Sequence, residues 1–128
     1  MKEGYLKKIN NSITEKIIAR HIRLQDQAPL EAVMLQFLLI ELFLRSNILV
    51  KLKAKKKKYF DNDDCKFSQL IDYYDLLGGG EKLVVLLRKY NKGRNVIMHH
   101  ALKFKSVEAL EKEAKETFNR GQKIIEKL

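Results

Sequence analysis

Residues 29–52 read PLEAVMLQFLLIELFLRSNILVKL, and this stretch decides the fold. Its apolar side chains would point in nearly every direction around a helix, and Pro29, the only proline of the chain, stands where a helix commonly begins. A helix with so little polar surface is either surrounded by other helices or also forms a subunit interface. The stretch therefore predicts the central helix of a bundle.

Glu41 stands in the middle of this apolar run. Its ionised carboxylate needs a partner, because burying an uncompensated charge is very costly. Two roles fit the sequence. Glu41 either pairs with an arginine or lysine of a neighbouring helix, or it lies behind a functional site and orients an arginine or histidine there.

Helical periodicity extends to both sides of the central stretch. Apolar residues recur three and four positions apart over residues 3–25, which predicts an amphipathic first helix. After the central helix we expect a third helix that starts at Asp64 or Ser68 and ends at the three glycines 78–80. These glycines lack the ending of a P-loop, so they predict a turn and not a phosphate cradle.

Gly93 is predicted to divide the remaining chain. A fourth helix over 81–92 would end at Gly93 in the left-handed conformation, and a short helix would follow from Arg94 or Asn95 to about Phe104. Ser106 would cap the last helix. With no period-two run to predict a strand, we expect one all-α domain over residues 1–128, an up-and-down bundle of four long helices plus the short one.

The charge of the chain favours a polyanionic partner. The net charge is +10, with 13 Lys/Arg against 5 Asp/Glu in residues 1–60 and 13 against 11 in residues 61–128. Nucleic acid fits such a field, although basic surfaces also simply keep small proteins soluble. Cys65 is the only cysteine, and together with three scattered histidines it matches no zinc-ligand spacing, so no metal or other cofactor is expected.

The chain carries no pattern that predicts a membrane protein. Its first residues lack the apolar run of a secretory signal, and the apolar run 37–44 is interrupted by Glu41 and shorter than a bilayer span. We therefore expect a cytoplasmic protein with no membrane partner.

A lysine-rich segment follows the central helix. Six lysines fall within residues 51–58, followed by Tyr59 and Phe60 and then by the acidic stretch 61–64. The segment would either grip a nucleic-acid backbone or form a solvated connector whose acidic half offsets its basic half. On the first interpretation the candidate substrate-binding residues are Lys55, Lys56, Lys57 and Lys58.

The stretch 94–99, RNVIMH, combines the groups that phosphate chemistry needs. If a helix began at Asn95, its free N–H groups would bind an anion, Arg94 would grip a phosphate in two-pronged fashion, and His99 would exchange protons near neutral pH. On one continuous helix, however, residues five apart differ by about 140° in direction and ~7.5 Å in rise. Convergence then requires either Arg94 in the helix cap or a second subunit.

The motif Arg94-Asn95-x-x-x-His99, in a helical context before a final amphipathic helix, resembles the HEPN superfamily (higher eukaryotes and prokaryotes nucleotide-binding domains). The resemblance implies a metal-independent endoribonuclease that acts as a homodimer, often as the toxin of a toxin–antitoxin or phage-defence system. It implies that Arg94 and His99 are catalytic and that Asn95 is the polar residue that often follows the arginine.

The resemblance has one departure and leaves two rival functions. Some family toxins carry a tyrosine, two positions after the histidine, that a partner antitoxin nucleotidylates; here Ala101 stands there, so that route of silencing is not expected. His100 has no family counterpart and would support the site from behind or face solvent. The rivals are a non-catalytic HEPN-like module that binds nucleic acid or a nucleotide, and a helical assembly protein.

Overall fold

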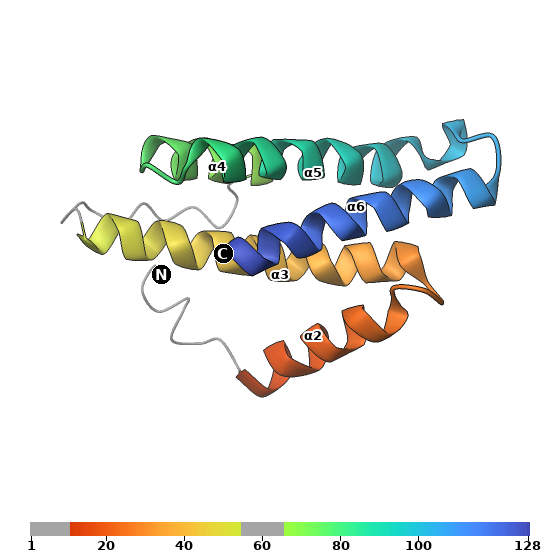
Figure 1. Ribbon diagram of the computed structural model, residues 1–128, viewed down its shortest axis with the longest axis horizontal. Coiled ribbons are helices and arrows are strands. Elements are labelled where there is room, and N and C mark those ends of the chain that lie inside the picture. Colours follow the sequence, from red (N-terminus) through yellow and green to blue (C-terminus); the bar gives the residue numbers. More distant parts are fainter. Residues whose placement is uncertain (1–10, 55–65) are drawn as a thin grey trace.

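The computed structural model describes residues 11–54 and 66–128, and these residues are helical almost throughout, with no strand among them. The helices are α2 (Asn11–Leu24), α3 (Pro29–Ala54), α4 (Phe67–Leu76), α5 (Glu81–His100) and α6 (Val107–Lys127), with a 3-10 turn η1 (Ala101–Lys103) between α5 and α6 (Figure 1). The prediction of an all-α fold is confirmed for these residues.

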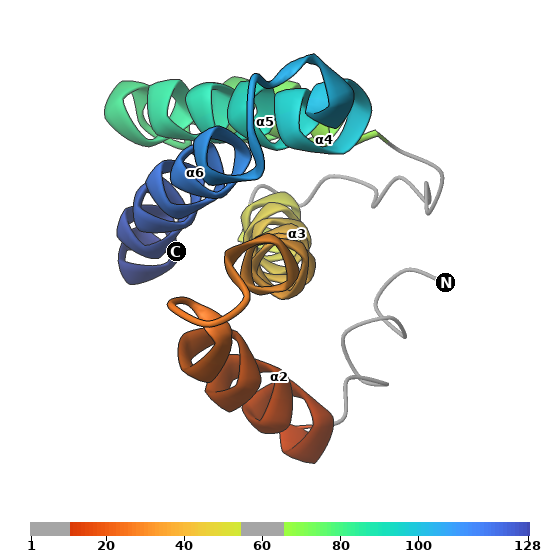
Figure 2. The same cartoon turned by 90° about the vertical axis from the view of Figure 1, so that its right-hand side faces the viewer.

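Helix α3 is the element around which the others are arranged. It contacts α2, α4 and α6, and the end-on view shows α2 on one side of it, α6 on another and the α4–α5 pair on a third (Figure 2). Ile40 and Leu44 are completely buried on α3, and Ile48 nearly so. Because each buried side chain of this size stabilises the fold by roughly 1.5–3 kcal/mol, α3 supplies much of the core.

The core has two parts along α3. Around the C-terminal half of α3, the apolar faces of α4 and α5 pack with the end of α6. Around its N-terminal half, the end of α5 and the middle of α6 close a second cluster, which consists of Ala32, Val33, Ile97, Ala114 and Phe118. The second cluster matters for function because it fixes the segment of α5 that carries the 94–99 motif.

A polar network ties α2, α3 and α6 together. The buried imidazole of His21 contacts the carbonyl of Ile18 at 2.6 Å and Oε1 of Gln122 at 3.2 Å. Gln36 is also buried and donates through Nε2 to the carbonyl of Phe118 at 2.8 Å and to Oε1 of Gln122 at 3.1 Å. Gly121 permits this approach, because a Cβ there would collide with the Gln36 amide. Buried polar groups need such partners, so the network positions α2 against the rest of the bundle.

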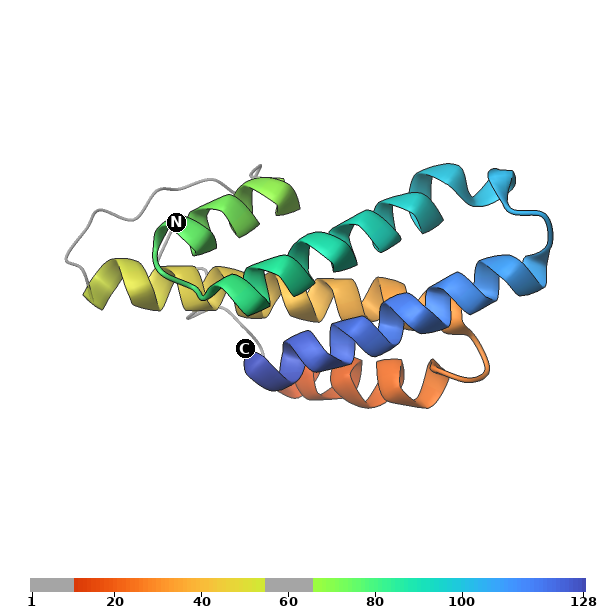
Figure 3. The ribbon, with the colours of Figure 1, turned by 45° about the horizontal axis from the view of Figure 1, so that its top comes forward.

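Helix α5 is continuous through Gly93, so the expected stop at Gly93 and the separate short helix after it are wrong (Figure 3). The reason is packing between helices. Gly93 is buried against α6, and a Cβ there would lie 2.6 Å from Oγ1 of Thr117. Glycine at this position therefore allows two helix backbones to approach closely. The apolar contacts of Ile97 stabilise the helix beyond it.

Two of the other predicted boundaries are confirmed. Gly78 and Gly80 have φ values of 82° and 98° and form the expected turn. Ser106 caps α6, accepting from the backbone N–H of Ala109 at 3.1 Å. Helix α4, however, begins at Phe67 rather than at Ser68, and the Lys66 N–H donates to Oε1 of Gln69 at 2.9 Å; Asp64 lies outside the described residues.

Helix α3 also bears on the membrane prediction. By length and composition its segment Pro29–Lys53 is long and apolar enough to cross a bilayer, so the expectation of too short an apolar run is wrong. The helix continues through Glu41 and adds apolar residues on both sides. A central bundle helix meets the same criteria, and α3 contacts three other helices. Cytoplasmic location stays a prediction.

Replacing Gly93 by alanine tests the close approach of α5 and α6. Relative to glycine, alanine stabilises an isolated helix by about 1 kcal/mol. We nevertheless expect Gly93→Ala to lower the free energy of unfolding by about 1–3 kcal/mol, because the added Cβ would collide with Thr117. Urea denaturation of both single variants and of Gly93→Ala/Thr117→Ala measures the coupling. The double variant should recover at least half of the loss; a stabilised Gly93→Ala protein would contradict the packing argument.

Candidate functional site

Arg94 lies on the side of α5 that faces α3 and is half-buried there. Its guanidinium carbon lies 3.8 Å from the centroid of the Phe37 ring, which is a close cation–π contact. One terminal nitrogen donates to Oδ1 of Asn95 at 3.0 Å and, more weakly, to Oδ1 of Asn91 at 3.4 Å. The side chain is thus held in one orientation by its own helix and by an aromatic ring of α3.

The surroundings of Arg94 are partly desolvated. Burial lowers the pKa of Arg94, while the nearby Tyr90 and the carboxylate of Glu41 raise it. Its Nε is buried, and no residue of 11–54 or 66–128 offers it a hydrogen-bond partner. A guanidinium stays charged under all ordinary conditions, so this environment strengthens its attraction for an anion rather than neutralising it.

Glu41 pairs within its own helix. Its Oε1 accepts from Nε of Arg45 at 3.3 Å and from a terminal nitrogen of Arg45 at 3.1 Å. The expectation of a partner on a neighbouring helix is therefore wrong, because Arg45 one turn further along α3 satisfies the carboxylate first. The charge of Glu41 also raises the pKa of Arg94 on α5, and its role behind the site stays a prediction.

Tyr90 lies one turn before Arg94 and is completely buried. Burial raises the pKa of Tyr90 well above its usual range, an effect that the positive charge of Arg94 only partly offsets. Its hydroxyl has no hydrogen-bond partner among the described residues. An unpartnered buried hydroxyl carries a desolvation cost, so Tyr90 and Arg94 each hold a polar atom that the described residues do not satisfy.

His99 is exposed and lies on a different face of α5 from Arg94. Because α5 is continuous, the two side chains leave the helix about 140° apart. The expected anion site built from free N–H groups at Asn95 is also wrong, since Asn95 lies inside the helix and its amide oxygen accepts from Arg94. One protomer therefore does not bring Arg94 and His99 together.

The remaining predicted residues are distributed as follows. His100 is exposed and lines a surface cavity of about 300 Å³ with Val96, Lys103 and Phe104, so it lies away from Arg94. Lys55, Lys56, Lys57 and Lys58 lie outside the described residues. Within residues 11–54 and 66–128, no group of three His, Cys, Asp or Glu side chains is placed to hold a metal ion.

Three residues around Arg94 were missed from the sequence. Asn91 and Tyr90 stand three and four positions before Arg94, and a continuous α5 would have placed them beside it. The assumed break at Gly93 hid that signal. Phe37 offered no signal, because it is one of many apolar residues in a helix that is apolar all round.

Comparisons with known proteins add no identification. No family model matches the chain, and neither the curated proteins nor the solved structures contain a match to it. The interpretation of the site therefore rests on its residues and their geometry.

The buried hydroxyl of Tyr90 predicts a specific pH dependence. Folded Tyr90 stays protonated at alkaline pH, whereas Tyr90 of the unfolded chain ionises near pH 10. The free energy of unfolding is therefore unaffected by this group below pH 10 and falls as the pH rises above 10. At pH 10.5 this difference lowers the free energy of unfolding by about 0.8 kcal/mol.

Tyr90→Phe should remove this part of the alkaline loss and leave stability at pH 7.5 unchanged or slightly higher, because no residue in the described part of the chain partners the hydroxyl. Urea denaturation of both proteins at the two pH values isolates the effect from that of the lysines. The same alkaline loss in both proteins would show that Tyr90 is not desolvated in solution.

Proposed function

We propose that this protein is a metal-independent endoribonuclease that acts as a homodimer, with Arg94 and His99 as its catalytic residues. The observation that carries the proposal is the pairing, on one helix, of a desolvated but charged guanidinium with an exposed imidazole about 7.5 Å further along the axis. These groups supply charge stabilisation and proton transfer, the two functions that cleavage of a phosphodiester needs.

The divergence of the two side chains favours a site shared by two protomers. Exposed apolar residues flank the Arg94–Phe37 contact: Met34 and Leu38 on α3 are 50% and 53% exposed, and Met98 on α5 is 45% exposed. Apolar surface of this kind is stabilised when a partner covers it. A second copy on this face would place two Arg94 side chains at the interface and bring the His99 of one chain toward the Arg94 of the other.

The proposed chemistry is a transfer within the RNA chain. One His99 accepts the proton of a ribose 2′-hydroxyl, whose oxygen attacks the adjacent phosphorus while the bond to the 5′-oxygen breaks. The same imidazole, now protonated, donates that proton to the 5′-oxygen, so the products carry a 2′,3′-cyclic phosphate and a 5′-hydroxyl. Arg94 stabilises the charge that develops on the phosphate oxygens, exchanging its long contact to Asn91 for the substrate.

A second function is favoured by one observation, the engagement of Arg94 within its own chain. Its terminal nitrogen already bonds Asn95, and the guanidinium is stacked on Phe37. If this arrangement persists when RNA is bound, the domain binds nucleic acid without cutting it. An antitoxin partner belongs to the first function alone, and Ala101, half-buried in η1, offers it no tyrosine to modify.

The proposal predicts that RNA cleavage persists in excess EDTA and is lost in Arg94→Ala and in His99→Ala. Arg88→Ala is the matched control, because Arg88 lies on the same helix but is exposed and paired with Asp72 at 3.0 Å. Cleavage of labelled mixed RNAs on denaturing gels is the measurement. Equal RNA binding by all variants with no cutting by any would instead favour the binding module.

Mixing the two inactive variants tests whether the site is shared. A heterodimer of Arg94→Ala and His99→Ala chains contains one intact site if Arg94 and His99 come from different chains. After subunit exchange, about a quarter of wild-type activity should return, since about half of the dimers are mixed and each has one of two sites intact. If each chain built its own site, mixing would restore nothing.

A further inference from the structure

A groove runs along the junction of α5 and α6, on a different side of α5 from Arg94. Its central cavity, of about 230 Å³, is lined by Lys89, Lys92, Gly93 and Val96 of α5 and by Glu113 and Arg120 of α6. A second cavity of about 270 Å³ adjoins it through Arg120, and a third of about 300 Å³ adjoins it through Val96. Because each neighbouring pair of cavities shares a lining residue, the three follow one another along the two helices, and we refer to them together as the α5–α6 groove.

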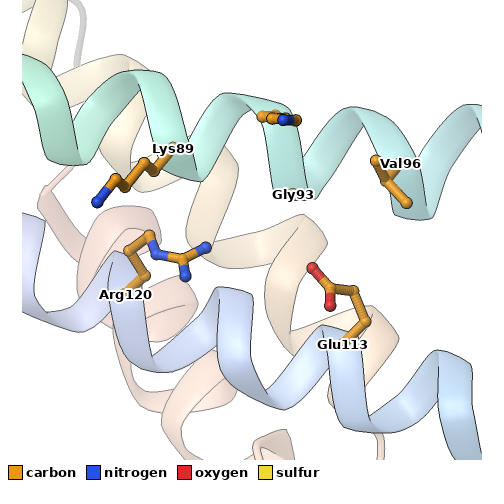
Figure 4. Close-up of a pocket in the computed structure, with 6 residues that line it drawn as sticks. Lys89, Gly93, Val96, Glu113 and Arg120 are labelled. Atoms are coloured by element: carbon orange, nitrogen blue, oxygen red, sulfur yellow. The ribbon is translucent and has the colours of Figure 1, made fainter.

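The packing of the two helices defines the floor of this groove. Gly93 lacks a side chain, which lets α5 approach Thr117 closely and leaves space above it. In the close-up, Lys89 and Val96 extend from α5 toward α6, while Arg120 and Glu113 extend from α6 toward α5 (Figure 4). The charged groups thus face a common space from two helices rather than dispersing into solvent.

The groove is predominantly basic. Five cations line it against two carboxylates, with the histidine counted as neutral: Lys89, Lys92, Lys103, Arg120 and Lys123 against Glu113 and Glu116. Within the described residues, no ion pair joins either glutamate to these cations. Cations that are not neutralised by a neighbouring carboxylate are available to phosphates, and each such contact releases counterions.

One end of the groove adds features that suit nucleotides. The cavity there is lined by Phe104, which is half-buried, together with His100 and Lys103. An aromatic ring beside a row of cations is the combination that binds single strands, with bases stacked on the ring and the backbone along the cations. Glu113, in the middle of the groove, can accept a hydrogen bond from a ribose hydroxyl or a base amino group.

We propose that this α5–α6 groove binds single-stranded RNA, with the backbone phosphates along Lys89, Lys92 and Arg120 and a base stacked at Phe104. A groove between two packed helices admits one strand, whereas a duplex presents its phosphates on a broad convex surface. The strand leaves the groove beside His100, next to His99 in the sequence. That the bound strand is the substrate rests on the proposed function; the binding itself does not.

The first test removes charge from the groove. The Lys89→Gln/Lys92→Gln/Arg120→Gln variant is compared with Lys16→Gln/Arg20→Gln/Arg23→Gln, which removes three charges from the exposed face of α2. Both are made with His99→Ala so that bound RNA stays intact, and fluorescence anisotropy measures binding of a labelled 12-nucleotide strand in EDTA. The groove variant should bind at least about tenfold more weakly, and its salt slope should fall by about 2, because three phosphate contacts are lost.

The α2 variant should stay within about threefold of its parent, with an unchanged salt slope. Equal losses in both variants would mean that overall charge alone governs binding, and an unaffected groove variant would place the RNA elsewhere. Thermal unfolding confirms that both variants are folded. If the groove variant loses binding but wild type cuts no RNA, the groove assignment is supported and the nuclease proposal is contradicted. If wild type cuts RNA and the groove variant binds normally, the nuclease proposal is supported and the groove assignment is contradicted.

The second test addresses the nucleotide features. Phe104→Leu should weaken binding about fivefold or more while leaving the salt slope unchanged, because stacking is lost but no phosphate contact is. Unchanged affinity would show that no base stacks on Phe104. Polyglutamate of equal charge and an RNA duplex of equal length should both bind more weakly than the single strand. Either one binding as tightly would overturn the assignment to single-stranded RNA.

Discussion

The burial of α3 is the constraint on which the rest of the structure depends. A helix with apolar side chains in nearly every direction must be covered, and α2, α6 and the α4–α5 pair approach it from three sides. Its N-terminal half stays partly uncovered at Met34 and Leu38. Phe37, between those two positions, receives the guanidinium of Arg94 and so couples the core helix to the helix that carries the motif.

Helix α5 presents different chemistry on its different faces. Toward α3 it carries the desolvated Arg94 and Tyr90, and toward α6 it carries the lysines and Gly93 that line the basic groove. His99 is exposed near its C-terminal end. The proposed dimer brings the His99 imidazole to an arginine across the interface, and the proposed groove brings a phosphate backbone to His100, beside His99 in the sequence. The two proposals therefore act on one helix from different sides.

Much of the fold could be predicted from local rules, and the site could not. The central helix, the turn at 78–80 and the cap at Ser106 follow from apolar periodicity, positive φ at glycine and side-chain capping, each of which acts within a few residues. The predicted helix end at Gly93 was wrong because a glycine that ends a helix and a glycine that lets two helices approach look alike in sequence. The contact that distinguishes them is with Thr117, which lies 24 positions away. The surroundings of Arg94 and the groove could not be predicted for the same reason. The aromatic partner of Arg94 comes from a distant helix, and the cations of the groove come from two helices.

The central claim is that Arg94 and His99 act on the same phosphodiester without a metal. Mass spectrometry of the ends produced from a short RNA in excess EDTA tests it most directly. The account predicts products with a 2′,3′-cyclic phosphate and a 5′-hydroxyl, formed by wild type and by neither Arg94→Ala nor His99→Ala. Products with a 5′-phosphate and a 3′-hydroxyl, or cyclic ends formed equally by either variant, would contradict it.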